Sequence, residues 1–209
     1  MTKVHIHEDN EGMRNLYPVA AYDDVEEDLI AGKKASVENR APGGIGWTDV
    51  HQIKEPDATY AKVGTSLKDM ATAVEQHLPR IDHFEVGFGD GNPFHHRDIG
   101  GFTFGFGDHL YVRFDTKDDV LLGIWYDVTT SDLSELEALR QTFLEINTVQ
   151  RSMIADHWMH TGGRIDDEAF LTGYLNEIEQ HFAERAAMAP PTPKLTFLQW
   201  LILKVFGTR

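Results

Sequence analysis

Cysteine is absent from this chain of 209 residues. Its absence excludes disulfides, thiolate catalysis, iron–sulfur clusters held by cysteine and cysteine-based zinc sites. The sequence also lacks an apolar stretch long enough to span a membrane, and its N-terminus lacks the basic-then-apolar pattern of a signal peptide. We therefore expect a cytoplasmic protein.

Basic residues are scarce. The chain has 19 Lys and Arg against 34 Asp and Glu, which gives a formal net charge of -15. A charge of this sign repels phosphate backbones, and the sequence contains no dense basic cluster that would bind them. We expect no nucleic-acid partner, whereas a basic protein partner fits the charge.

The overall composition is that of a globular protein, with 41% apolar and 25% charged residues. Its length fits one hydrophobic core, so we expect a single domain over residues 1–189. Three prolines between residues 190 and 193 predict a stiff spacer, and residues 194–209 form an apolar tail.

Apolar and polar residues alternate in the middle of the chain. A period of two, typical of half-buried strands, runs through residues 84–88, 102–106 and 110–114, and residues 120–128 are almost continuously apolar. The breaks between these runs are short and polar, which favours hairpins and hence an antiparallel sheet. Outside this block the strand signals are weaker: a short edge strand at 4–6 and a brief strand at 50–53 are the only ones.

Helical spacing appears on both sides of the strand block. It predicts helices over 23–30, over 67–78 with Ser66 as the N-cap, and from 131 onward with Ser131 or Thr130 as the cap. The last of these is expected to continue or resume through 153–158 and to end at Gly162-Gly163, before a final helix over 168–182. The sequence thus predicts an α+β fold: an antiparallel sheet of about four to six strands packed against three or four helices, plus an apolar C-terminal helix.

Histidine is the residue that invites a chemical hypothesis, because it binds metals and transfers protons near neutral pH. Several of the 11 histidines lie near one another or near an aspartate in the predicted loops and helices. The candidate metal ligands are His95, His96, Asp98, Asp108, His109, His157 and His160. His157 and His160 would share one face of a helix, and the others lie in or beside a glycine-bearing loop. These matches lack a complete motif, so surface or hydrogen-bonded core histidines are the favoured interpretation.

Other catalytic and binding motifs are missing from the sequence. No Gly-x-Ser-x-Gly nucleophile elbow occurs, and the glycine-rich stretch at 87–92 lacks the residues that complete a P-loop or an EF-hand. The catalytic residues are therefore unknown, and no cofactor is predicted other than a divalent metal.

The C-terminal tail carries an unusual density of apolar residues. The residues that we expect to form an interaction surface are Leu195, Phe197, Leu198, Trp200, Leu201, Ile202, Val205 and Phe206. A segment of this kind must be buried away from water. It could pack on its own domain, on a second copy in a homodimer, or in a membrane interface. Docking on protein is the favoured of these alternatives.

The favoured function is a non-catalytic protein-interaction module, similar in composition to acidic immunity or inhibitor proteins that neutralise a basic partner. One alternative is a metal-dependent hydrolase that uses the loop and helix histidines. Another is a peripheral membrane protein attached through residues 194–206.

Overall fold

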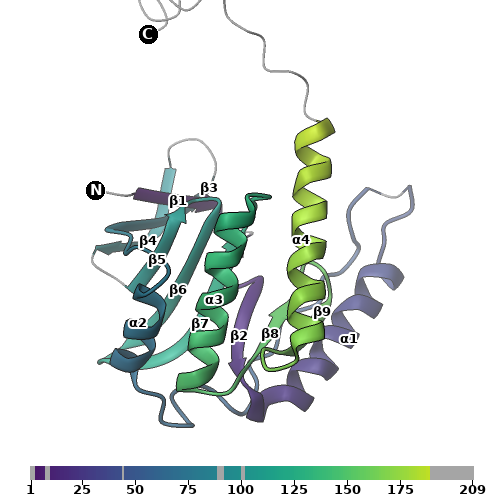
Figure 1. The fold of residues 1–209 in the computed structure, drawn as a ribbon. Coiled ribbons are helices and arrows are strands. Elements are labelled where there is room, and N and C mark those ends of the chain that lie inside the picture. The colour runs from purple at the N-terminus through teal and green to yellow at the C-terminus, as the bar shows by residue number, and fades with distance from the viewer. Residues whose placement is uncertain (1–2, 8–9, 44, 89–91, 100–101, 189–209) are drawn as a thin grey trace, which may run out of the picture.

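The computed structural model describes residues 3–7, 10–43, 45–88, 92–99 and 102–188. It describes their side chains except at 3, 5, 7, 87, 88 and 92–99. These residues form an α+β fold (Figure 1), which confirms the predicted class. The predicted spacer at 190–193 and the apolar tail at 194–209 lie outside the described residues.

The larger of two sheets has six strands in the order β5-β6-β7-β2-β8-β9, and every neighbouring pair in it is antiparallel. The strands are β2 (Arg14–Pro18), β5 (Phe102–Gly107), β6 (Leu110–Lys117), β7 (Val120–Val128), β8 (Ser152–Asp156) and β9 (Thr161–Arg164). The hairpins predicted from the alternation at 102–128 are confirmed as β5-β6-β7. Strand β2 lies in the middle of the sheet, although the sequence shows only a weak pattern before residue 20.

A smaller sheet of three strands packs against one end of the larger one. It consists of β1 (Lys3–His7), β3 (His83–Phe88) and β4 (Asn92–Ile99), with β1 parallel to β3 and β3 antiparallel to β4. Phe84 of this sheet packs edge-on against Tyr111 and Trp125 of the larger sheet, at ring-centroid distances of 5.2 and 5.6 Å. The parallel pair is an addition to the predicted antiparallel architecture.

The described residues contain four α-helices, α1 (Tyr22–Glu38), α2 (Leu67–Glu75), α3 (Leu133–Val149) and α4 (Glu168–Met188), and the short 3-10 helix η2 (Val19–Ala21). Ser66 caps α2 as predicted, because its side chain accepts a hydrogen bond from the backbone N–H of Asp69. The cap of α3 is Asp132 rather than Ser131 or Thr130. Its carboxylate accepts hydrogen bonds from two backbone N–H groups of the first turn.

The larger sheet is covered on both faces. On one face Leu16, Ile124 and Ile154 belong to the main core, together with residues of α2, α3 and α4. Their strand neighbours point the other way, because side chains alternate along a strand. On that face the small sheet covers Tyr111 and Trp125, and α1 covers Met153 and Ala155. Helix α1 and helix α4 therefore lie on opposite sides of β8.

The predicted helix through 153–163 is wrong: this stretch forms β8, a turn and β9. All five residues of β8 are buried, since it is covered on both faces. A short run that is apolar on both faces has no period by which a strand can be told from a buried helix. The predicted strand at 50–53 is also wrong, because the chain has no regular structure there.

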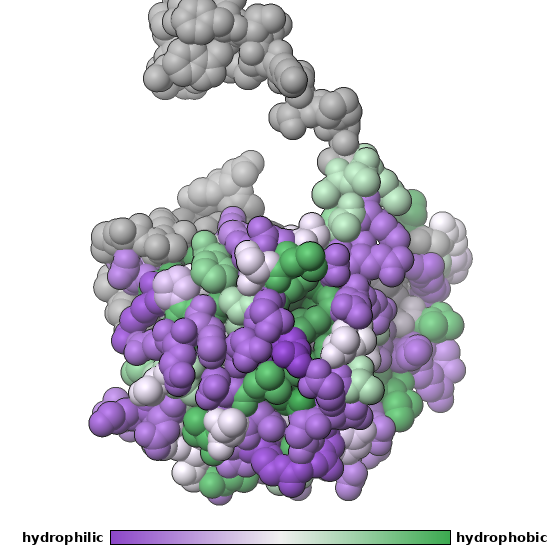
Figure 2. All heavy atoms as spheres, viewed as in Figure 1, coloured by the Kyte–Doolittle hydropathy of each residue, from purple (hydrophilic) through white to green (hydrophobic). Residues whose placement is uncertain are grey.

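Apolar side chains appear in separate patches among hydrophilic ones on the face that carries α2, α3 and α4 (Figure 2). Helix α4 extends beyond the sheet at its C-terminal end (Figure 1). None of the helices within the described part of the chain is both long and apolar enough to cross a membrane.

Candidate functional site

The β8–β9 turn, residues 157–160, lies between two hollows. The first, the arginine cleft, has a volume of about 490 Å³ and is lined by Asn10, Arg14, Asp127, Thr129, Trp158, Met159, Glu177, Ile178, His181, Phe182 and Arg185. The second, the histidine groove, has a volume of about 350 Å³ and is lined by Met13, Gly32, Ala35, Ser36, Trp47, Asp49, Val50, His51, Ile53, His157, Trp158 and His160. Trp158 belongs to both hollows and is 50% exposed.

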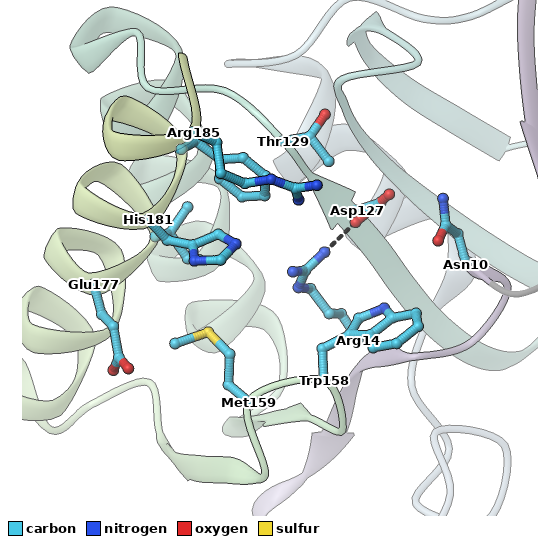
Figure 3. Close-up of a pocket in the computed structure, with 11 residues that line it drawn as sticks. Asn10, Arg14, Asp127, Thr129, Trp158, Met159, Glu177, His181 and Arg185 are labelled. Atoms are coloured by element: carbon cyan, nitrogen blue, oxygen red, sulfur yellow. Dashed lines mark hydrogen bonds and ion pairs between the residues drawn. The ribbon is translucent and has the colours of Figure 1, made fainter. Parts of the chain in front are cut away.

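The arginine cleft lies where three strands of the larger sheet end. Arg14 begins β2, Asp127 lies next to the end of β7, and Asp156 ends β8. Because β2 runs between β7 and β8 and antiparallel to both, these three residues come together at one edge of the sheet. Helix α4 forms the facing wall (Figure 3).

A buried ionic network forms the floor of the arginine cleft. The Arg14 guanidinium donates one hydrogen bond to Asp127 Oδ1 and another, of 2.8 Å, to Asp156 Oδ2. The three residues are only 7%, 4% and 0% exposed. Buried charges are tolerated when they are paired and hydrogen-bonded, and here one cation neutralises part of the charge of two carboxylates.

Two buried tyrosines complete the network. Tyr174 of α4 donates a hydrogen bond of 2.9 Å to Asp156 Oδ2, and its hydroxyl lies 2.7 Å from that of Tyr126. Burial raises the pKa of Tyr174 well above its ordinary value, so the phenol remains a donor. Burial also raises the pKa of Asp127, although Arg14 and the backbone N–H of Val128 oppose that shift. The network links the sheet edge to α4 and directs its hydrogen bonds inward.

The walls of the arginine cleft combine apolar and charged side chains. Ile178, Phe182 and Met159 provide apolar surface, and the Arg185 guanidinium lies 6.0 Å from the centre of the Phe182 ring. His181 and Arg185 extend from α4 toward Arg14 (Figure 3). The cleft thus has mixed apolar and charged walls above a floor formed by the buried ionic network.

Asp28 of α1 lies beside the histidine groove and is 5% exposed. His51 Nε2 donates a hydrogen bond of 2.9 Å to Asp28 Oδ1, and His157 Nδ1 lies 3.9 Å from Asp28 Oδ2. Gly32 lies one helical turn after Asp28, and its lack of a side chain leaves room for the rings of His51 and His160. A Cβ at that position would lie 3.2 Å from the His51 ring and 3.5 Å from that of His160. His51 and His157 therefore lie beside Asp28, and the His160 ring lies near Gly32.

The polar groups of this cluster are only partly satisfied. Asp28 Oδ2 and His157 Nε2 are buried and have no hydrogen-bond partner among the described residues. Burial lowers the pKa of His157, and the nearby His160 and His51 lower it further, against the raising effect of two aspartates. Burial and Lys33 lower the pKa of His160 as well. A lowered pKa favours the neutral form of both rings at pH 7.

A third hollow, the acidic hollow, adjoins Asp28 on α1. It has a volume of about 240 Å³ and is lined by Asp24, Glu27, Asp28, Ala31, Lys54, Glu55, Pro56 and Asp57. The carboxylates that line it outnumber the ammonium group of Lys54, and they affect the pKa of a neighbouring tyrosine. Burial, and then Asp28 and Glu55, raise the pKa of Tyr17 to about 12.

The structure separates the histidines that the sequence singles out. Asp108 and His109 form the β5–β6 turn, where His109 Nε2 lies 3.0 Å from a carboxylate oxygen of Glu135. His157 and His160 lie in the β8–β9 turn. Strands β6 and β8 are three positions apart in the sheet, which is about 14 Å at the usual strand spacing. His109 and the His157–His160 pair therefore do not form one site.

His95, His96 and Asp98 lie in strand β4 rather than in the predicted loop, and their side chains are outside the described set. The predicted helical pairing of His157 with His160 is wrong, since both lie in a turn and His160 has a φ of 47°. Among the side chains that the structure describes, no group of three or more His, Asp or Glu residues is arranged to hold a metal ion.

Sequence reasoning misses Arg14, Asp127, Asp28 and His51. Arg14 is separated from its two carboxylate partners by 113 and 142 residues, so no local pattern could join them. Asp28 resembles the solvated acids around it in α1, although its place on the buried side follows from Val25 and Leu29 beside it.

Comparison with known proteins adds nothing to this geometry. The chain matches no protein-family model, no curated protein and no solved structure.

Proposed function

We propose that this protein is a non-catalytic protein-interaction module that binds a basic partner through α1 and the segment 47–57. The observation that carries the proposal is that the histidine groove and the acidic hollow lie along the same helix. Asp28, which lines the acidic hollow, accepts a hydrogen bond from His51, which lines the groove. One hollow offers aromatic walls and the other offers carboxylates, and both open on the same helix.

The residues around the histidine groove have the composition of an interface. Trp47 is 53% exposed, Val50 is 76% exposed, and Trp158 stands at the opposite edge. Tryptophan is enriched among the few residues that dominate binding energy, especially where it borders a pocket. Trp47 is also held in place, because its indole N–H donates a hydrogen bond of 2.9 Å to the backbone carbonyl of Ser36. A fixed aromatic side chain loses little entropy on binding.

The acidic hollow sets the charge of the partner. Asp24, Glu27, Glu55 and Asp57 are exposed, and among the described residues Lys54 is the only basic one that lines the hollow. Carboxylates placed beside an aromatic groove fit a partner segment that presents Lys or Arg next to an apolar side chain. An inhibitor that neutralises a basic protein would use such a surface.

The polar floor of the arginine cleft supports a non-catalytic role. A general base or nucleophile must have a group free to exchange a proton with a substrate. Arg14, Asp156 and Tyr174 direct their described hydrogen bonds to one another or to buried neighbours. This favours a structural role for the network.

The test is capture of a partner from an extract of the source cells at low salt, with four matched variants. We expect one basic protein to be retained in stoichiometric amount and released by salt, because screening weakens charge pairing. Trp47→Ala and Glu55→Lys should each weaken its binding by about tenfold or more. The controls, Leu133→Ala and Glu137→Lys, change exposed residues of α3 and should bind as the wild type does. Absence of a partner at low salt, or equal retention by all five proteins, would contradict the proposal.

A further inference from the structure

Helix α4, which lines the arginine cleft, is followed in the sequence by the apolar tail of the chain. Ile178 and Phe182 of α4 line the cleft, and α4 ends at Met188. The spacer at 190–193 and the apolar residues of 194–206 follow directly. From this continuity we infer that residues 194–206 of the same chain occupy the arginine cleft. The inference concerns a different hollow from the proposed partner surface and does not depend on it.

The cleft and the segment suit each other in polarity. The segment has an apolar side chain at most of its positions, so it needs a cover in water. The cleft offers Trp158, Met159, Ile178 and Phe182 around a floor in which Arg14 is bonded to both carboxylates. An amphipathic segment that lays its apolar side chains into an apolar-walled groove is a common mode of recognition.

The length of the chain permits the contact. Ile178 to Met188 is ten residues of helix, which is about 15 Å at the usual rise. A spacer of four residues with three prolines reaches about 12 Å when extended. The segment can thus begin near the end of α4 and run back along it to the cleft. A hollow of about 490 Å³ holds a few large side chains rather than a helix, so we expect aromatic anchors such as Phe197 and Trp200 to enter it.

Charge favours the same contact. Residues 190–209 contain three basic residues and no acid, which leaves 16 basic and 34 acidic residues, a charge of -18, in the rest of the chain. The lining of the cleft is balanced, with Glu177 and Asp127 against Arg14 and Arg185, so the attraction comes from the body of the chain as a whole. A basic segment is attracted to an acidic body over a distance of about 10 Å at moderate ionic strength.

The absence of cysteine makes a direct test simple, because two introduced cysteines are then the only thiols. The test variant is the full chain with Met159→Cys in the cleft and Leu198→Cys in the tail. The matched control pairs Leu198→Cys with Leu122→Cys. Leu122 is 43% exposed and lies five residues before Asp127 on β7, about 17 Å from the cleft. Both variants are treated with a short bismaleimide linker at low protein concentration, and the linked peptides are identified by mass spectrometry.

We expect the Met159–Leu198 pair to be linked within one chain, in at least fivefold higher yield than the Leu122–Leu198 pair. Adding Phe182→Ser to the test variant should lower that yield several-fold. A covalent dimer as the main product would overturn the inference in favour of a second copy as the occupant. Equal yields from both pairs would overturn it as well. Flotation of the wild-type chain with vesicles of phosphatidylcholine and phosphatidylglycerol would assign the segment to a membrane surface instead.

Discussion

The two hollows on either side of Trp158 treat their buried charges in opposite ways. In the arginine cleft, Arg14 is bonded to two carboxylates and Tyr174 satisfies one of them further. In the histidine groove, Asp28 Oδ2 and His157 Nε2 have no hydrogen-bond partner among the described residues. A buried polar group left unsatisfied costs about 1–3 kcal/mol of stability. The comparison indicates that the polar groups of the cleft floor satisfy one another, whereas those beside the groove cost stability.

The largest expected effect concerns the cleft. Arg14→Met removes the cation of the network and leaves two buried carboxylates uncompensated. We expect the free energy of unfolding, measured by urea denaturation at pH 7, to fall by about 3–5 kcal/mol. The control is Arg151→Ala, which removes an ion pair between an exposed arginine and Asp166 and should cost no more than about 1 kcal/mol. Similar losses in both variants would mean that the network is not structural.

The second prediction concerns the pH dependence of the groove. The pKa of His157 is lowered in the folded protein, so the unfolded chain binds more protons once the pH falls below the ordinary value of about 6.5. Stability should therefore decrease as the pH falls from 7 toward the folded-state pKa, by at most about 1.4 kcal/mol per pH unit for this residue. His157→Gln should flatten that slope in urea titrations at several pH values. An unaltered slope in His157→Gln would contradict the prediction.

The smallest expected effect would sharpen the comparison by testing how tightly the histidines contact α1. Replacing a helical glycine by alanine adds up to about 1 kcal/mol of stability where space permits. A Cβ at Gly173 of α4 would have nothing within 4 Å, whereas at Gly32 it would lie 3.2 Å from the His51 ring. Gly173→Ala should therefore gain stability in full when measured by urea denaturation, and Gly32→Ala should gain less and displace His51. An equal gain in both variants would show that the His51 ring moves aside without a loss of stability.

Much of the fold is accessible from the sequence where one face of an element meets water. The alternation at 102–114 predicts β5 and β6, and the Ser66 cap predicts the start of α2, because each is a local pattern. Strand β8 cannot be told from a buried helix in the sequence. Both of its faces are covered, one by α1 and the other by α4, so its residues do not alternate between apolar and polar. The centre of the sheet at β2 escapes prediction for a related reason: Arg14, which is charged, occupies a buried strand position that only its distant partners make acceptable.

The candidate site is accessible only in part. His157 and His160 can be singled out by residue type, but Asp28 and His51 come from other segments, and only the packing of α1 against the sheet brings them together. The alternative in which His109 joins His157 and His160 in one metal site is not favoured by the sheet order, which places His109 about 14 Å from the β8–β9 turn. Residue type thus indicates where polar chemistry lies, and the strand order decides which groups meet.

Trp158 has a consequence for how the two hollows communicate. Its ring forms part of the wall of each, so an occupant that moves it for one hollow reshapes the other. Thermodynamic reciprocity then requires that whatever the cleft does to the affinity of the groove, the groove does to that of the cleft by the same factor. A single indole on a hairpin turn would in this way make the protein's own tail and its outside partner either cooperative or competitive.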